Sequence, residues 1–396
     1  MRARYFAVRD AKRMAPEYSD LKSRYEIPAA DLFSDEFICT GGGGHVFGGR
    51  WNKKACACGR RITVPIAVKC YIGTDAESQC LRELDTLVSV DHPNIVKAYG
   101  YACGMENAPF SGSAVRYLIL ELAPGRSLHD KKAELKDLRK EDAAEHVERV
   151  AGYAVQILDG LRCLHEQHLL HLDLKPANGL CFDRGVIKLC DFGASKHFRA
   201  SLGDASAAGG YTLQYAAPET MLRDDMDAAG NEIPHELSQS SFVSPATDMY
   251  SFGALLCELL TGVPVWGRKH EVAICCAVGS GESPDVSRHP WPEGTEEIHQ
   301  LVCRLLSFNP DERDTLEDAQ RILSGFYFHR VTTTLMSPCM NTSSDGSPSG
   351  LSPAASMPGT TMAALRYEVE VCNCQQVSVV PKDDAQGTTY GGGGGI

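Results

Sequence analysis

Several polar side chains in the middle of the sequence have the types and spacing needed to move a proton and bind a divalent cation. The run HLDLKPAN at residues 171–178 contains Asp173, Lys175 and Asn178, and Asp191 follows a short run typical of a strand. A carboxylate can accept the proton of a hydroxyl group, and carboxylate and amide oxygens suit Mg²⁺. A lysine beside them can neutralise developing negative charge. Together these residue types suit phosphoryl transfer.

A glycine run and a strand lysine could bind the phosphates of a nucleotide. The glycine run and the valine that follows it comprise Gly41, Gly42, Gly43, Gly44 and Val46. A backbone without Cβ atoms can approach phosphates and offer N–H donors, although a glycine run is also typical of a flexible turn. In the run VPIAVKC at residues 64–70, alternation places Ala67 and Lys69 on one face of a strand.

The surrounding elements change type along the chain. Short β-branched or aromatic runs predict strands at residues 37–47, 62–71, 95–103 and 117–122, with one helix at 76–90. Later periodicity predicts helices at residues 143–165, 247–260, 296–306 and 316–323, and a solvated helical stretch at 131–149. We therefore expect an α+β fold with a small antiparallel-sheet lobe at 31–123 and a mainly α-helical lobe at 124–330.

The ends of the chain differ in composition from this domain. Residues 1–30 have mixed charge without a clear period and form an extension with no assigned structure, and 223–244 is typical of a polar surface insertion. Residues 331–396 are rich in Ser, Pro, Gly and Thr, so we expect most of this tail to be disordered.

In this order and spacing, the motifs resemble those of the eukaryotic protein kinase family. Lysine at position 175 is similar to the serine/threonine type, and the strings HLDLKPAN and GRSL are similar to Mos-like and tyrosine-kinase-like kinases. The resemblance implies a two-lobed enzyme that transfers the γ-phosphoryl group of ATP to protein hydroxyls in signalling. ATP would bind between the lobes with two Mg²⁺ or Mn²⁺ ions, and the protein partners would be substrates.

The resemblance also implies a role for each residue of the reaction centre. Asp173 would accept the substrate proton, and Lys175 would neutralise the transferring group. Asn178 and Asp191 would hold the metal ions, and Lys69 would bind the α- and β-phosphates.

The helix partner of Lys69 and the nucleotide contacts follow in the same way. Glu83 has the family's spacing from the later His-Pro pair and is preferred as the Lys69 partner, with Glu77 as the alternative. Backbone groups of Glu121 and Ala123 would meet the adenine edge. Ser127 would contact the ribose or, equally, cap a helix, and Leu180 completes the nucleotide-binding candidates.

Four further features concern the catalytic loop and the segment that follows Asp191. Glu219 would form an ion pair with Arg313, and Asp248 would hold the backbone of the catalytic loop. The Thr212 hydroxyl is expected to be solvated. Leu172 stands where regulated kinases often carry a phosphate-binding arginine, so we expect activity without loop phosphorylation.

Departures from the family pattern leave two alternative functions open. Cys39 and Gly43 replace usual residues of the glycine loop, and Gly179 replaces a β-branched residue after Asn178. They favour a pseudokinase that signals by docking, which the complete set of reaction-centre residues opposes. A small-molecule kinase of the same fold is the other rival, opposed by the segment from Thr212 to Glu219.

The composition limits the partners and the compartment. A formal net charge of -12 argues against broad binding to nucleic acid or anionic lipid, and no apolar run is long enough for a membrane span. Sixteen cysteines are scattered through core-like stretches, which favours free thiols and a cytoplasmic or nuclear location. The C-x-C pairs at residues 56–58 and 372–374 leave a zinc site as a minor alternative.

Overall fold

The structure is a computed structural model of the whole chain. It describes residues 17–41, 44–54, 61–105, 108, 110, 112, 114–197, 212–221 and 243–335. Gly42, Gly43, both C-x-C pairs, nearly all of the insertion and the tail beyond residue 335 lie outside these ranges. Contacts divide the chain into Met1–Ser337 and Pro338–Ile396, and all the described residues belong to the first unit.

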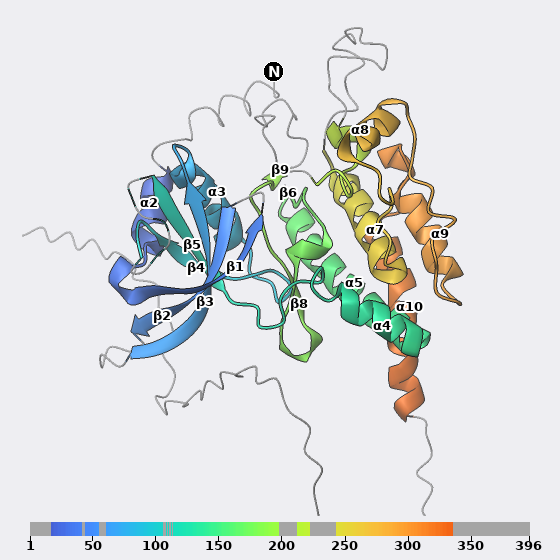
Figure 1. The fold of residues 1–396 in the computed structure, drawn as a ribbon, viewed down its shortest axis with the longest axis horizontal. Helices are drawn as coiled ribbons and strands as arrows, with labels where there is room; N and C mark the ends of the chain where they lie inside the picture. Colours follow the sequence, from blue (N-terminus) through green and yellow to red (C-terminus); the bar gives the residue numbers. More distant parts are fainter. Residues whose placement is uncertain are drawn as a thin grey trace, which may run out of the picture. The chain divides into compact units, whose positions relative to one another are not determined.

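The first lobe is built on a five-stranded antiparallel sheet in the order β1-β2-β3-β5-β4 (Figure 1). Its strands are β1 (Leu32–Gly41), β2 (Gly44–Lys54), β3 (Arg61–Ile72), β4 (Ala98–Ala102) and β5 (Val115–Glu121). The single strand predicted at residues 37–47 is wrong, because β1 and β2 form a hairpin that pairs Gly41 with Gly44. Gly44 has φ +129°, and a Cβ there would lie 2.3 Å from the Cys70 carbonyl oxygen, so glycine is required.

Two helices accompany this sheet. Helix α3 (Ala76–Ser89) agrees with the predicted helix, and it buries Leu81, Leu84 and Leu87. Helix α2 (Glu17–Tyr25) lies in the extension to which the sequence assigned no structure. The chain after α2 joins the sheet lobe, since the Ile27 N–H donates to the Tyr101 carbonyl at 2.8 Å.

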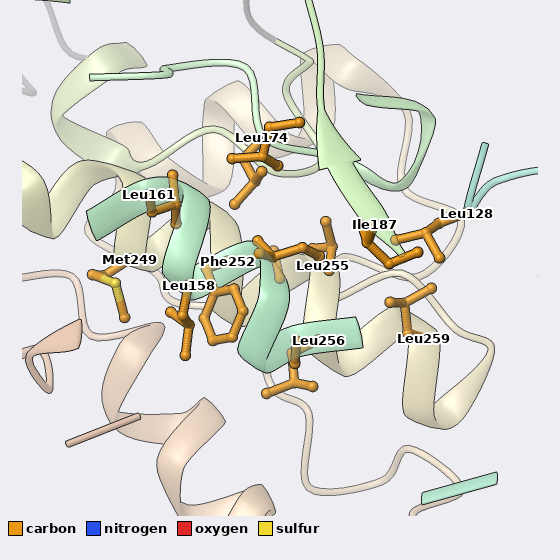
Figure 2. Packing of buried hydrophobic residues seen from close by; sticks show 14 of the residues in the cluster. Leu128, Leu158, Leu161, Leu174, Ile187, Met249, Phe252, Leu255, Leu256 and Leu259 are labelled. Atoms are coloured by element: carbon orange, nitrogen blue, oxygen red, sulfur yellow. The ribbon is translucent and has the colours of Figure 1, made fainter. Parts of the chain in front are cut away.

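The second lobe is helical, which confirms the predicted α+β class. Its helices are α4 (Lys132–Glu141), α5 (Ala143–Glu166), α6 (Pro218–Met221), α7 (Pro245–Thr261), α8 (Glu271–Gly279), α9 (Glu296–Leu305) and α10 (Leu316–Leu335). Figure 2 shows side chains of α5 and α7, including Leu158, Leu161, Phe252 and Leu255, packed in one buried cluster. The helices described are all too short or too polar to cross a bilayer.

The helix predictions needed three corrections. The stretch 131–149 breaks at Asp142, whose side chain accepts from the Glu145 N–H at 2.8 Å and so begins α5. Helix α10 continues well past residue 323. Helix α8 was not predicted, since its sequence EVAICCAVG is too uniformly apolar to show a polar face.

Short elements position the loops of the reaction centre. Strands β7 (Gly179–Cys181) and β8 (Ile187–Leu189) form one ribbon, and β6 (Leu169–Leu170) pairs with β9 (Lys196–His197). The 3₁₀ turn Pro176–Asn178 lies between β6 and β7. The run HLDLKPAN is therefore anchored by strand pairing on both sides.

Candidate active site

A buried ion cluster joins the sheet lobe to the helical lobe. The Lys69 Nζ atom on β3 lies 2.7 Å from Glu83 Oε2 on α3 and 2.6 Å from Asp191 Oδ1. Lys69 and Glu83 are only 5% and 1% exposed, so water screens their attraction weakly. Glu77, the alternative partner, instead contacts Lys22 and Arg116.

The cluster keeps Lys69 and Asp191 charged. Burial alone would lower the pKa of Lys69, but the charges of Glu83, Tyr71 and Asp191 raise it well above its usual value. Burial alone would raise the pKa of Asp191, but Lys69 and the hydrogen bond from it lower that pKa. At neutral pH the lysine is therefore a cation beside an ionised aspartate.

Asp173 lies at the centre of a second cluster, made by residues of the HLDLKPAN run. Its Oδ2 atom is 2.6 Å from Lys175 Nζ, and the Asn178 amide donates to its backbone oxygen at 2.8 Å and to Oδ2 at 3.1 Å. The Thr212 hydroxyl lies 3.0 Å from Asp173 Oδ1 and 2.8 Å from Lys175 Nζ. The expectation that Thr212 is solvated is therefore wrong, because it completes this cluster.

A buried carboxylate holds the backbone before Asp173. The Asp248 side chain accepts from the N–H groups of His171 at 2.9 Å and Leu172 at 2.8 Å. Burial would raise the pKa of Asp248, but a hydrogen bond from His165 and the charges of His165 and His171 lower it, so it stays an acceptor. Leu172 and Asp191 both have φ +65°, a conformation that costs a non-glycine residue roughly 1–2 kcal/mol. Asp248 therefore stabilises the bend that presents Asp173.

Asn178 and Asp191 offer oxygen donors that fit a divalent cation. Because the Asn178 amide nitrogen donates to Asp173, its Oδ1 atom is the one left for a cation. Asp191 adds a carboxylate that is 24% exposed. Mg²⁺ commonly takes one or two such protein oxygens and completes its shell with phosphate oxygens and water.

Several of the predicted nucleotide-binding residues are apolar and belong to or pack against the main core cluster. Ala67 belongs to the large buried cluster, and Val46 and Leu180 pack against it as partly buried side chains. The Glu121 carboxylate pairs with Lys188 at 2.7 Å, so its side chain is occupied. Ala123 directly follows the end of β5, which leaves backbone groups of this segment as the candidate adenine edge.

Ser127 and the two ends of the glycine run lie in turns. The Ser127 hydroxyl and N–H both donate to Asp130, at 2.6 and 3.0 Å, which favours a turn cap over a ribose contact. Gly41 and Gly44 close the β1–β2 hairpin. Gly179 begins β7, and a Cβ there would lie 2.7 Å from Leu128 Cδ1, so Leu128 occupies the space of the missing side chain.

The segment after the reaction centre is fixed by a buried ion pair. Arg313 binds Glu219 through two contacts of 2.7 and 2.8 Å, and both side chains are nearly inaccessible. A further hydrogen bond runs from Thr247 to the same carboxylate at 2.9 Å. This fork geometry pins the residues from Thr212 to Glu219 beside the catalytic loop.

Sequence reasoning missed Tyr71. Its hydroxyl donates to the same Glu83 oxygen that Lys69 contacts, and its ring centroid lies 5.3 Å from Lys69 Nζ. The period of a strand could have revealed it, because residues 67, 69 and 71 share one face of β3.

Comparisons with known proteins agree with this geometry. A family model described as "Protein kinase domain" matches residues 35–328. The human SNF-related serine/threonine-protein kinase is 28% identical over 263 residues, which are 66% of this chain and 30% of that protein. Mitogen-activated protein kinase kinase 9 of Arabidopsis thaliana is 31% identical over 242 residues, 60% of this chain and 67% of that protein.

A third relative, like the Arabidopsis protein, has a name that contains the words mitogen-activated protein kinase kinase. The putative mitogen-activated protein kinase kinase kinase 7-like protein of Drosophila melanogaster is 27% identical over 304 residues, 74% of this chain and 66% of that protein. The chain spans less than a third of the length of the SNF-related kinases that it matches.

Proposed function

This chain belongs to the protein kinase family, and we propose that it is an active enzyme that transfers the γ-phosphoryl group of ATP to serine or threonine hydroxyls of proteins. The observation that carries the proposal is the complete cluster around Asp173, in which a carboxylate, a lysine and a threonine hydroxyl meet at 2.6–3.0 Å. A docking protein without catalytic activity would have no need of this arrangement.

The geometry supports different roles for the two clusters in the reaction. Asp173 would accept the proton of the incoming hydroxyl, and Lys175 would stabilise the charge on the transferring phosphoryl group. Thr212 bonds both side chains and so fixes their separation. Lys69, held by Glu83, would bind phosphate oxygens of the nucleotide.

Asn178 and Asp191 would hold Mg²⁺ or Mn²⁺. The bound cation would supply charge neutralisation of the phosphate oxygens. Asp191 also contacts Lys69 at 2.6 Å, so one carboxylate joins the phosphate-binding lysine to the metal site. Lys69 thereby positions Asp191 from the sheet lobe.

The choice of a protein substrate rests on the segment from Thr212 to Glu219. This segment is bound to Asp173 at one end and to Arg313 at the other, and so forms a fixed surface beside the reaction centre. Such a surface suits an extended peptide better than a small molecule. A signalling role follows from this substrate class.

We also propose that the protein works in a reducing compartment, the cytoplasm or the nucleus. Free thiols among the described residues support it: Cys39, Cys70, Cys80, Cys103, Cys163, Cys181, Cys190, Cys257, Cys275, Cys276 and Cys303. Fractionation of cells that express the tagged full chain would test this location.

The test of activity compares Asp173→Ala with Asp183→Ala. Asp183 is an exposed aspartate on a nearby turn and serves as the matched control. Radiolabel transfer from ATP to a generic protein substrate should fall about 10²- to 10⁴-fold in Asp173→Ala and stay unchanged in the control. Equal transfer by wild type and Asp173→Ala would refute the assignment of Asp173 as the group that accepts the substrate proton. Phosphoamino-acid analysis of the product would distinguish serine and threonine from tyrosine.

A further inference from the structure

Four exposed basic residues lie on two neighbouring loops of the helical lobe. Arg268, Lys269 and His270 connect α7 with α8, and Arg288 lies between α8 and α9. These four residues are called the basic patch below. The two loops meet where His289 Nε2 lies 3.1 Å from the Pro264 carbonyl oxygen.

The basic patch lies next to the segment that contacts Asp173. The Gln214 side chain donates to the Lys269 carbonyl at 3.3 Å, and Gln214 is two positions after Thr212. The Thr212 hydroxyl is 3.0 Å from Asp173. The path from the Asp173 carboxylate to the Lys269 backbone runs through the Thr212 side chain, about 7 Å of extended chain and the Gln214 side chain. Its length sets an upper limit of roughly 20 Å on the distance between the two groups. An extended peptide spans that distance with about six residues.

The charged residues of the basic patch, Arg268, Lys269 and Arg288, form no ion pair within the described part of the chain. No carboxylate there forms an ion pair with any of the four residues, whereas nearby Arg304 binds Asp314 at 2.8 Å. The closest acids along the chain are Glu271, which is exposed, and Asp285, whose carboxylate is bound by Ser287 at 2.6 Å and also attracts Arg288 without forming an ion pair with it.

One of these cations also has a fixed direction. Lys269 Nζ lies over the Trp266 ring, 5.0 Å from its centroid, and Trp266 is only 5% exposed. The buried indole holds the lysine stem, which lowers the entropy lost when the ammonium group binds an anion.

We propose that the basic patch recognises an anionic side chain, acidic or phosphorylated, within about six residues of the hydroxyl to be phosphorylated. The proposal deepens the proposed function and rests on it. An acidic substrate is repelled by the net charge of the chain as a whole, so the patch supplies the local attraction that selects it.

The test measures kcat/KM on matched peptides that carry serine as the acceptor. Peptides with glutamate, phosphoserine or alanine at each of the flanking positions distinguish a carboxylate from a phosphate as the anion. Wild type should favour the anionic peptides over the alanine ones by roughly 2- to 5-fold at low ionic strength. The preference should shrink at 1 M salt, where the screening length is about 3 Å.

The variant Arg268→Glu with Lys269→Glu should abolish this preference and leave kcat/KM on the alanine peptides unchanged. Its control is Lys53→Glu with Lys54→Glu on β2, which makes the same charge change. It also removes an equivalent contact, since Lys53 Nζ lies 5.0 Å from the Trp51 ring centroid. The control should keep the preference.

Two outcomes would overturn the inference while the proposed function stands. One is a wild type that phosphorylates anionic and alanine peptides equally. The other is a preference that the patch variant and the control reduce by the same factor, which would assign it to net charge. Absence of transfer to every peptide would instead refute the proposed function, and this inference with it.

Discussion

Replacement of Tyr71 by phenylalanine removes one hydroxyl from the buried cluster around Lys69 and keeps the ring. Tyr71 is 3% exposed, and its hydroxyl donates to Glu83 Oε2. Burial, and then the charge of Glu83, raises the pKa of this hydroxyl well above its usual value, so it remains a donor. The other Glu83 oxygen is buried and has no hydrogen-bond partner in the described part of the chain. The variant would leave Glu83 with Lys69 as its partner.

The size of the effect follows from the charge of the acceptor. A hydrogen bond to an ionised group contributes about 1.5–3 kcal/mol, because the desolvated carboxylate is left short of a donor when the bond is lost. We expect the free energy of unfolding of Tyr71→Phe to fall by about that amount. We also expect kcat/KM for ATP to fall about 10-fold, which corresponds to ~1.4 kcal/mol less stabilisation of the placed Lys69.

The assay pairs denaturant unfolding with initial rates at varied ATP. Tyr117→Phe is the matched control, because Tyr117 is also buried and its hydroxyl donates to the neutral Phe110 carbonyl, away from Lys69. The control should lose about 0.5–1.5 kcal/mol of stability and keep its kcat/KM for ATP. The reasoning is refuted if the two variants lose the same stability and Tyr71→Phe keeps the wild-type kcat/KM.

Three further predictions concern the loop, β7 and α5. With Leu172 in place of a phosphate-binding arginine, a phosphatase-treated sample whose mass shows no phosphate should still transfer phosphate, and an inert sample would contradict this. Gly179→Val should lower unfolding stability by about 1–3 kcal/mol through its clash with Leu128, and Leu128→Ala in the same chain should recover part of the loss. His146 is buried beside the Leu260 carbonyl, and burial lowers its pKa below 6.5. The folded state therefore binds this proton less readily than the unfolded chain, so stability should fall below about pH 6.5 by at most about 1.4 kcal/mol per pH unit. Denaturant curves of His146→Gln should show a flatter pH dependence.

The parts of the site that could be predicted from the sequence are those fixed by local geometry. Asp173, Lys175 and Asn178 are close in sequence, so one bend of the backbone brings them together. Strand alternation likewise places Ala67 beside Lys69 with no knowledge of the rest of the fold. Glu83 needed the spacing of a family, because Glu77 on the same helix satisfies charge and distance along the chain equally well.

The parts that could not be predicted depend on contacts between distant segments. Thr212 is polar and lies in a loop, so nothing local distinguishes it from a solvated hydroxyl, yet it binds Asp173. Strand alternation places Tyr71 on the face of Lys69, but its hydrogen bond to Glu83 depends on where that helix residue lies in the fold. Helix α2 is only nine residues long, too short for a clear period, and its apolar Tyr18, Leu21 and Tyr25 find their partners in the large buried cluster built by distant segments. The chain after it bonds to the β4 edge through Ile27 and Tyr101.

Leu172 shows how an apolar contact can replace a charged one at the centre of the site. It is 4% exposed and packs in one buried cluster with Leu170 and Val243, against which Ala194 also lies. Val243 is just before α7 and Ala194 is just after the Asp191 motif, so the cluster joins the catalytic loop to both sides of the intervening segment. Burial of a leucine side chain contributes about 1.5–3 kcal/mol, and this contribution needs no phosphate. An arginine at this position would be a buried cation, and the catalytic loop could take up the same position only if an anion neutralised that charge. With leucine, hydrophobic packing adds to the hydrogen bonds from Asp248 in holding the catalytic loop, and neither contribution needs a phosphate.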